Sequence, residues 1–172
     1  MKNFIEKEFI KYYLGDKFIR AHVDAVHAVP PYADQFTGEI VMGLINKINC
    51  SGIISKVSRK KIDLNRRRDV NNKEIIIGTR NGESCSNEIK EWFIEEINKY
   101  YENIVVDSIF PGDSSKIVHR LGDHVSDLSY QGYGKNYNTI QIEISRNLRE
   151  NQQKELINIL SNIILSFNKI FL

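Results

Sequence analysis

The sequence has few of the residues that mark secreted proteins, metal fingers or polyanion binders. It contains only two cysteines, Cys50 and Cys85, and their wide separation matches no CxxC metal or redox spacing, so we expect reduced thiols. The formal net charge is only +2, which gives no general reason to expect a polyanion partner. Hydrophobic residues make up 41% and charged residues 27% of the chain. This balance is typical of a globular protein and excludes a mainly disordered one.

Long apolar runs are also missing. The first 18 residues carry charges every few positions and lack the apolar centre of a signal peptide. The segment LINILSNIILSFNKIFL near the end is interrupted by asparagine, serine and lysine, and is too short to span a bilayer. We therefore expect a cytoplasmic protein without a membrane partner. The 172 residues contain no internal repeat and fit one domain, covering residues 1–172.

Strand-like and helix-like segments alternate along the chain. We expect strands at 17–29, where Pro30-Pro31 ends the ladder, and at 51–58, 60–65, 74–79, 103–110 and 138–145. Residues 74–79, EIIIGT, form a continuous apolar run that is typical of an interior strand. We expect three helices. The first begins at Asp34 or Thr37 and ends near Asn49, the second covers about 86–103, and the third begins near Glu150. This alternation predicts an α/β fold with a mixed or largely parallel sheet.

Each of the first two expected helices has one apolar face. In the first, the face consists of Ile40, Val41, Leu44, Ile45 and Ile48, and Asp34 or Thr37 can cap the helix. In the second, it consists of Ile89, Trp92, Phe93, Ile97 and Tyr100, and the residues from Ser84 to Asn87 offer caps. These faces are the candidate core of the protein.

The most specific motif is SRKKIDLNR, from Ser58 to Arg66. It concentrates two arginines, an aspartate and an asparagine within nine residues of a strand and turn. Such a segment either binds a ligand or forms a salt-bridged strand end in which Asp63 neutralises Arg66. Composition alone leaves both interpretations open.

The motif SRxxIDLNR resembles the signature of the N-formylglutamate amidohydrolases, and its DLNR part is similar to the segment of zinc carboxypeptidases that holds the substrate carboxylate. Further segments resemble parts of this family, and they occur in the same order. HAVPPYADQFTGE resembles its early metal-binding loop, and EIIIGTRNGES resembles a later strand and turn. DSIFPGDSSKIVHRLG resembles a Pro- and Gly-containing turn, and IQIEISRNLR resembles the closing QxEInR motif. Together they cover roughly residues 20–150. The resemblance implies a shortened member of the family, with a three-layer α/β/α, zinc carboxypeptidase-like fold.

The first candidate metal ligands are His27 and Asp34. His27 leaves a strand just before the Pro-Pro loop, and Asp34 lies seven residues further on, near the start of a helix. An imidazole nitrogen and a carboxylate oxygen are normal zinc ligands, completed by a third ligand and an open position. Glu39 is the alternative acidic ligand, although one turn into the helix it can instead face solvent. Without the resemblance, a polar contact between His27 and Asp34 would be the simpler interpretation.

The third ligand is not where the family has it. The resemblance implies a histidine in a DxHS-like motif after DLNR, but the eight residues between Arg66 and Ile75 contain none. His22, His119 and His124 remain, unless a carboxylate substitutes. His22 is the poorest candidate, because its spacing to His27 on one strand directs the two side chains to opposite faces. We prefer His119 to His124, because the apolar residues before it could fix its direction.

Glu143 is the candidate catalytic residue. It lies in a strand between Ile142 and Ile144, and a carboxylate in such a place is costly unless it is paired. The resemblance implies that it is the general base, which takes a proton and passes it to the leaving amine. The alternative is an ion pair with Arg146 or a lysine.

These residues predict a hydrolase that uses one zinc ion to cleave an amide bond. Arg59, Asn65 and Arg66 would hold a carboxylate or the developing oxyanion, and Arg120 is a further candidate. We therefore expect a small-molecule or peptide substrate that carries a carboxylate. The oligomeric state is not indicated.

Two other interpretations compete with the hydrolase. The missing histidine is also compatible with a metal-free, catalytically degenerate binding protein of the same fold. The basic runs KVSRKK and NRRR could form a nucleic-acid patch, but Asp63 interrupts them and such sites usually need a broader basic face. We expect no nucleic-acid partner.

Overall fold

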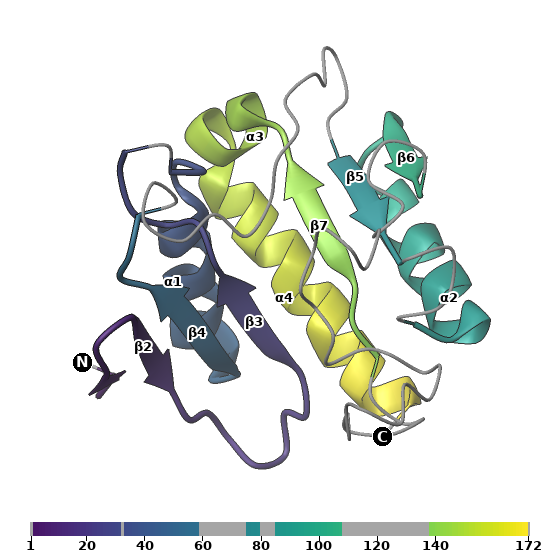
Figure 1. Ribbon diagram of the computed structural model, residues 1–172. Coiled ribbons are helices and arrows are strands. Elements are labelled where there is room, and N and C mark those ends of the chain that lie inside the picture. Colours follow the sequence, from purple (N-terminus) through teal and green to yellow (C-terminus); the bar gives the residue numbers. More distant parts are fainter. Residues whose placement is uncertain (1, 32, 59–74, 80–84, 108–137, 172) are drawn as a thin grey trace, which may run out of the picture. The chain divides into compact units, whose positions relative to one another are not determined.

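The computed structural model describes residues 2–31, 33–58, 75–79, 85–107 and 138–171 (Figure 1). The chain divides into two compact units, one formed by Met1–Asp63 with Arg146–Leu172 and the other by Leu64–Ser145. In the described residues, helices accompany sheets that mix parallel and antiparallel strands, which confirms the predicted α/β class with a mixed sheet. Of the five strand pairs within the described ranges, β3–β4 and β5–β6 are parallel and the others antiparallel.

The sheet of the first unit has the strand order β1-β2-β4-β3. These strands are β1 (Ile5–Glu6), β2 (Ile10–Tyr13), β3 (His22–Ala25) and β4 (Ser51–Ser55). The strand expected at 17–29 is confirmed only for its centre, so β3 ends two residues before His27. Strand β3 lies at the edge of the sheet. The chain passes from its end into the loop that carries His27 and Asp34.

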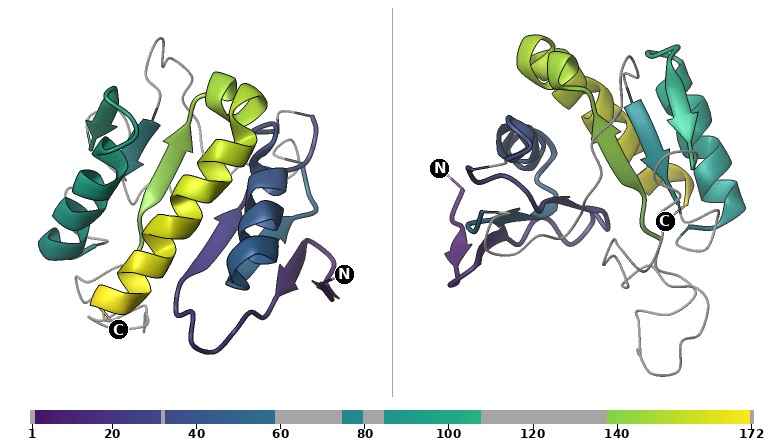
Figure 2. Two further views of the ribbon diagram at one scale, coloured as in Figure 1. Left: turned by 180° about the vertical axis from the view of Figure 1, so that it is seen from behind. Right: turned by 45° about the horizontal axis from the view of Figure 1, so that its top comes forward.

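Helix α1 (Thr37–Ile48) packs on this sheet, and α4 (Gln153–Ile170) packs on α1 (Figure 2). All five apolar residues predicted for the face of α1 are buried. Ile45 is fully buried, and a Cβ added at Gly52 of β4 would lie 2.7 Å from its Cδ1. The same Cβ would lie 2.9 Å from the backbone oxygen of Val23 on β3, so glycine at position 52 permits the close approach of the neighbouring strand.

Helix α1 begins at Thr37, one of the two predicted starts, but its predicted cap and the predicted start of the last helical region are wrong. The residue that precedes α1 is Phe36, with a left-handed φ of 69° and no side-chain capping bond, so neither Asp34 nor Thr37 is the cap. The hydroxyl of Thr37 instead donates to the carbonyl oxygen of Asp34 at 2.7 Å. The last helical region begins at Arg146 rather than near Glu150, as a short α3 (Arg146–Asn151) that precedes α4.

The sheet of the second unit has the order β6-β5-β7. Its strands are β5 (Ile75–Gly78), β6 (Ile104–Val106) and β7 (Gln141–Ile144), and every residue of β5 is buried, as predicted for an interior strand. Helix α2 (Asn87–Asn98) lies alongside β5 and β6 in both figures and is capped by Ser86, which lies within the predicted range. Phe93 and Ile97 are buried as expected. Tyr100 lies beyond the helix end and is 48% exposed, which corrects its assignment to the buried face; Tyr101 is buried instead.

Some predictions fall outside the described residues, among them the strand at 60–65 and the glycine-containing loop that follows β6. Within the described ranges, no helix combines the length and the apolar character needed to cross a membrane.

Candidate metal centre

His27 is a buried histidine with one ring nitrogen that lacks a partner. The residue is only 7% exposed, and its Nε2 has no hydrogen-bond partner among the described residues. A buried polar atom without a partner costs about 1–3 kcal/mol, so native proteins rarely keep one without a reason. Nε2 of His27 is therefore an atom at which the fold leaves a bonding position open.

Asp34 contacts the other ring nitrogen of His27. Its Oδ2 lies 3.1 Å from Nδ1, and its side chain is 35% exposed. Short backbone bonds hold the loop between them, because the N–H of Asp34 donates to the carbonyl oxygen of His27 at 2.8 Å. The N–H of Thr37 in turn donates to the carbonyl oxygen of Asp34 at 3.2 Å. The loop and the start of α1 thus bring together the two residues that the sequence singled out.

The separation of this pair is that of a hydrogen bond, and it also lies near the spacing of two zinc ligands. Zinc ligand distances of about 2.0–2.2 Å place two ligand atoms of a tetrahedral site about 3.4 Å apart, close to the observed 3.1 Å. The same separation also suits an Nδ1–H that donates to the carboxylate, which would leave Nε2 for the metal. In the first arrangement both residues would be ligands, and in the second His27 would be the ligand and Asp34 would orient it. The described residues contain no group of three or more potential ligands, so a third ligand is not among them.

The alternative acidic ligand, Glu39, lies in the first turn of α1 and is exposed. The carboxylate in contact with His27 is that of Asp34. The geometry therefore favours Asp34 over Glu39.

His22, the poorest candidate for the third ligand, lies on β3 beside Asp24. Its Nε2 is 3.4 Å from Oδ2 of Asp24. The hydrogen bond to Asp24 raises the pKa of His22, although burial acts in the opposite direction. This pair is built from positions i and i+2 of one strand, which lie on the same face. The candidates His119 and His124 lie outside the described residues, as do the expected substrate-binding residues Arg59, Asn65, Arg66 and Arg120.

Glu143 lies on β7 and pairs in register with Ile76 of β5. Its Oε1 accepts a hydrogen bond from the side-chain amide of Gln141 at 2.6 Å, and the residue is half-buried. The ion pair considered from the sequence is not the one observed, because Arg146 pairs with Glu150 at 3.2 Å. In the part of the chain that the structure describes, Glu143 is held by this neutral donor and forms no ion pair with Arg146 or a lysine.

A polar cluster at the ends of β5 and β6 was not singled out from the sequence. Asp107 has a left-handed φ of 49°, and its two carboxylate oxygens accept bonds from the N–H and the hydroxyl of Thr79, each at 2.6 Å. Nζ of Lys90 on α2 lies 4.0 Å from this carboxylate. The signal in the sequence was a polar residue directly after each of two apolar strands. The bonds from Thr79 to both oxygens of Asp107 tie the ends of β5 and β6 together.

No family model, no curated protein and no solved structure matches the chain.

Proposed function

We propose that the protein is a zinc-dependent hydrolase that cleaves an amide bond in a substrate carrying a carboxylate, such as an N-acyl amino acid or a peptide. The proposal includes the three-layer, zinc carboxypeptidase-like arrangement that the sequence motifs imply. The observation that supports it best is the buried His27 beside Asp34, with Nε2 of the histidine left without a partner among the described residues. In this proposal His27 and Asp34 bind the ion, and His119 is the third ligand.

Bound zinc would supply Lewis-acid chemistry that polarises the amide carbonyl and lowers the pKa of water. Glu143 would take a proton from the attacking water and deliver it to the leaving amine. Its hydrogen bond from Gln141 would keep the carboxylate oriented for this proton transfer. Arg59, Asn65 and Arg66 of the DLNR-containing motif, with Arg120, would hold the substrate carboxylate, because guanidinium groups form paired bonds to such anions.

Metal affinity tests the first part of the proposal. Zinc binding to the purified, chelator-treated protein is measured by competition with a chromophoric chelator, for the wild type, His27→Ala and Asp34→Asn. His27→Ala should abolish specific binding. Loss of an orienting carboxylate typically weakens metal binding about 10–100-fold, so a larger loss in Asp34→Asn identifies Asp34 as a ligand. Wild-type protein that binds no zinc would support the metal-free binding protein instead.

Activity tests the second part. Zinc-loaded protein is incubated with N-formyl and N-acetyl derivatives of glutamate and of leucinamide, and amine release is measured. We expect hydrolysis of the carboxylate-bearing compounds and a fall of at least about 100-fold in kcat for Glu143→Gln, the usual range for a general acid–base residue. Glu150→Gln, an exposed carboxylate paired with Arg146, is the matched control and should leave kcat unchanged. Equal loss in both variants would contradict the role of Glu143.

A further inference from the structure

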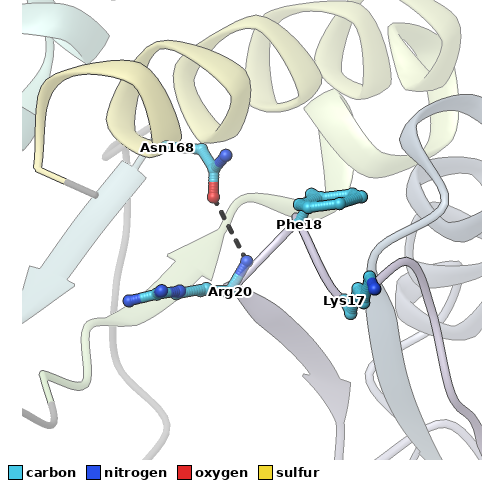
Figure 3. A pocket seen from close by; sticks show the side chains of 4 residues that line it. All are labelled: Lys17, Phe18, Arg20 and Asn168. Atoms are coloured by element: carbon cyan, nitrogen blue, oxygen red, sulfur yellow. Dashed lines mark hydrogen bonds between the residues drawn. The ribbon is translucent and has the colours of Figure 1, made fainter.

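The first unit contains a pocket whose lining includes none of the residues assigned to the metal. It is lined by Lys17, Phe18 and Arg20, which belong to the segment between β2 and β3, and by Asn168 in the last turn of α4 (Figure 3). Its volume is about 500 Å³. The pocket is a partly open depression and not an enclosed cavity. It shares no residue with the His27–Asp34 pair.

The segment that lines the pocket is held at several points. The N–H of Asp16 donates to the carbonyl oxygen of Asn49 at 2.7 Å, and the N–H of Gly15 donates to the hydroxyl of Ser51 at 3.0 Å. A Cβ added at Gly15 would lie 2.2 Å from the oxygen of Asn49, so only glycine permits this approach. The lining residues are therefore presented by a fixed backbone, which lowers the entropy cost of binding a ligand.

The polar groups that line the pocket are donors. The side-chain oxygen of Asn168 is already used, because it accepts a bond from the backbone N–H of Arg20 at 3.2 Å (Figure 3). Its remaining polar group is the NH₂, which only donates. Lys17 and Arg20 are also pure donors, and neither has an ion-pair partner in the part of the chain that the structure describes. The nearby carboxylate of Asp16 accepts a bond from the N–H of Phe18 at 2.9 Å. A ligand that satisfies the donors must supply acceptors, and an anion does so best.

Phe18 adds an apolar surface to this set. The residue is 70% exposed, and Nζ of Lys17 lies 5.1 Å from the ring centroid. An exposed aromatic ring beside cations is suited to stack on a planar group whose charge the cations neutralise. A favourable interaction with the helix dipole would by itself explain why Lys17 and Arg20 lie near the carbonyl end of α4. It does not explain why the ring of Phe18 is exposed beside them.

We propose that this pocket binds a small anion carried on a planar ring, an aromatic carboxylate or a nucleoside monophosphate. The ring stacks on Phe18, and the anionic group accepts bonds from Lys17, Arg20 and the NH₂ of Asn168. This binding is independent of zinc and of the proposed hydrolysis.

Titration calorimetry of the full chain in chelator tests the assignment with four probes: benzoate, adenosine monophosphate, adenosine and inorganic phosphate. We expect benzoate or the monophosphate, or both, to bind, with adenosine and phosphate at least about tenfold weaker, because each lacks half of the recognised chemistry. The stronger of the two anions identifies the source of the charge. Adenosine or phosphate binding as tightly as the better anion would overturn the proposal, as would no binding of any probe at millimolar concentration.

Asn168→Asp is the most selective variant. It keeps the oxygen that accepts from the N–H of Arg20 but replaces the NH₂ donor by a second carboxylate oxygen, so binding should fall at least about tenfold. Arg20→Gln should do the same through loss of a cation. Lys169→Gln removes a cation from the same turn of α4 without changing a lining residue, and serves as the control. Equal weakening in Lys169→Gln would show a general charge effect and overturn the site.

Discussion

Replacement of His27 by leucine separates the stability of the fold from the binding of a metal. Leucine removes the buried Nε2, whose lack of a partner costs about 1–3 kcal/mol, and also removes the bond to Asp34, worth about 1.5–3 kcal/mol. Because the Asp34 side chain is 35% exposed, water replaces part of that bond. The gain from removing the unpaired Nε2 and the loss of the bond to Asp34 therefore nearly cancel. We therefore expect the free energy of unfolding in EDTA to change by no more than about 1 kcal/mol.

With zinc the two proteins should differ. A ligand that binds only the folded state stabilises it by about 2.7 kcal/mol at a free concentration of 100 times Kd. We expect this increment for the wild type and none for His27→Leu. His22→Leu is the matched control on β3 and should keep the zinc increment.

Urea denaturation followed by circular dichroism gives both free energies. A loss above about 3 kcal/mol for His27→Leu in EDTA would refute the reasoning, because it would mean that the protein itself already satisfies Nε2. An equal zinc increment in wild type and His27→Leu would refute the assignment of the metal to this residue.

Three other predictions concern packing and protonation. Gly43→Ala in α1 should be destabilising despite the better helix propensity of alanine, because the added Cβ would lie 2.3 Å from Cδ1 of Ile157 in α4. Ile157→Val removes that atom, so a double-mutant cycle in urea should show a favourable coupling of about 1 kcal/mol; additive effects would contradict the contact. In an NMR titration, His22 should have a pKa above 6.5 that falls back in Asp24→Asn, since their hydrogen bond raises it. Its stabilising effect should be complete below pH 6.5 and lost as pH rises through the folded-state pKa. Burial raises the pKa of Cys85 to about 12, so iodoacetamide at pH 8 should label it slowly before urea is added and rapidly afterwards; fast labelling of the folded protein would be the opposite result.

The sequence predicted best where a repeating pattern reports burial. Ile45 and its neighbours on α1 follow the helical period, and the run Ile75–Gly78 has the continuous apolar character of an interior strand, so both were placed correctly. Helix ends were harder. The residue at the cap position of α1 is Phe36, which has a left-handed backbone and forms no side-chain capping bond. A phenylalanine rarely adopts this conformation, so the sequence does not predict it.

The sequence predicted the residues of the candidate site but not the contacts between them. The separation of His27 and Asp34 in the sequence did not predict the distance between their side chains, because the loop after Pro30-Pro31 has no periodicity. Backbone hydrogen bonds around Asp34 bring the two side chains to 3.1 Å. The partner of Glu143 was also missed. Gln141 lies two residues earlier on the same face of β7, so it is a nearer neighbour than the arginine or lysine that was considered.

The most direct test of the central claim is a crystal structure of the zinc-loaded protein, with the ion located by its anomalous scattering. The account predicts a zinc ion about 2.0–2.2 Å from a ring nitrogen of His27, with the carboxylate of Asp34 as a ligand or bonded to the other ring nitrogen. A structure in which no cation lies within that distance of either His27 nitrogen would contradict it.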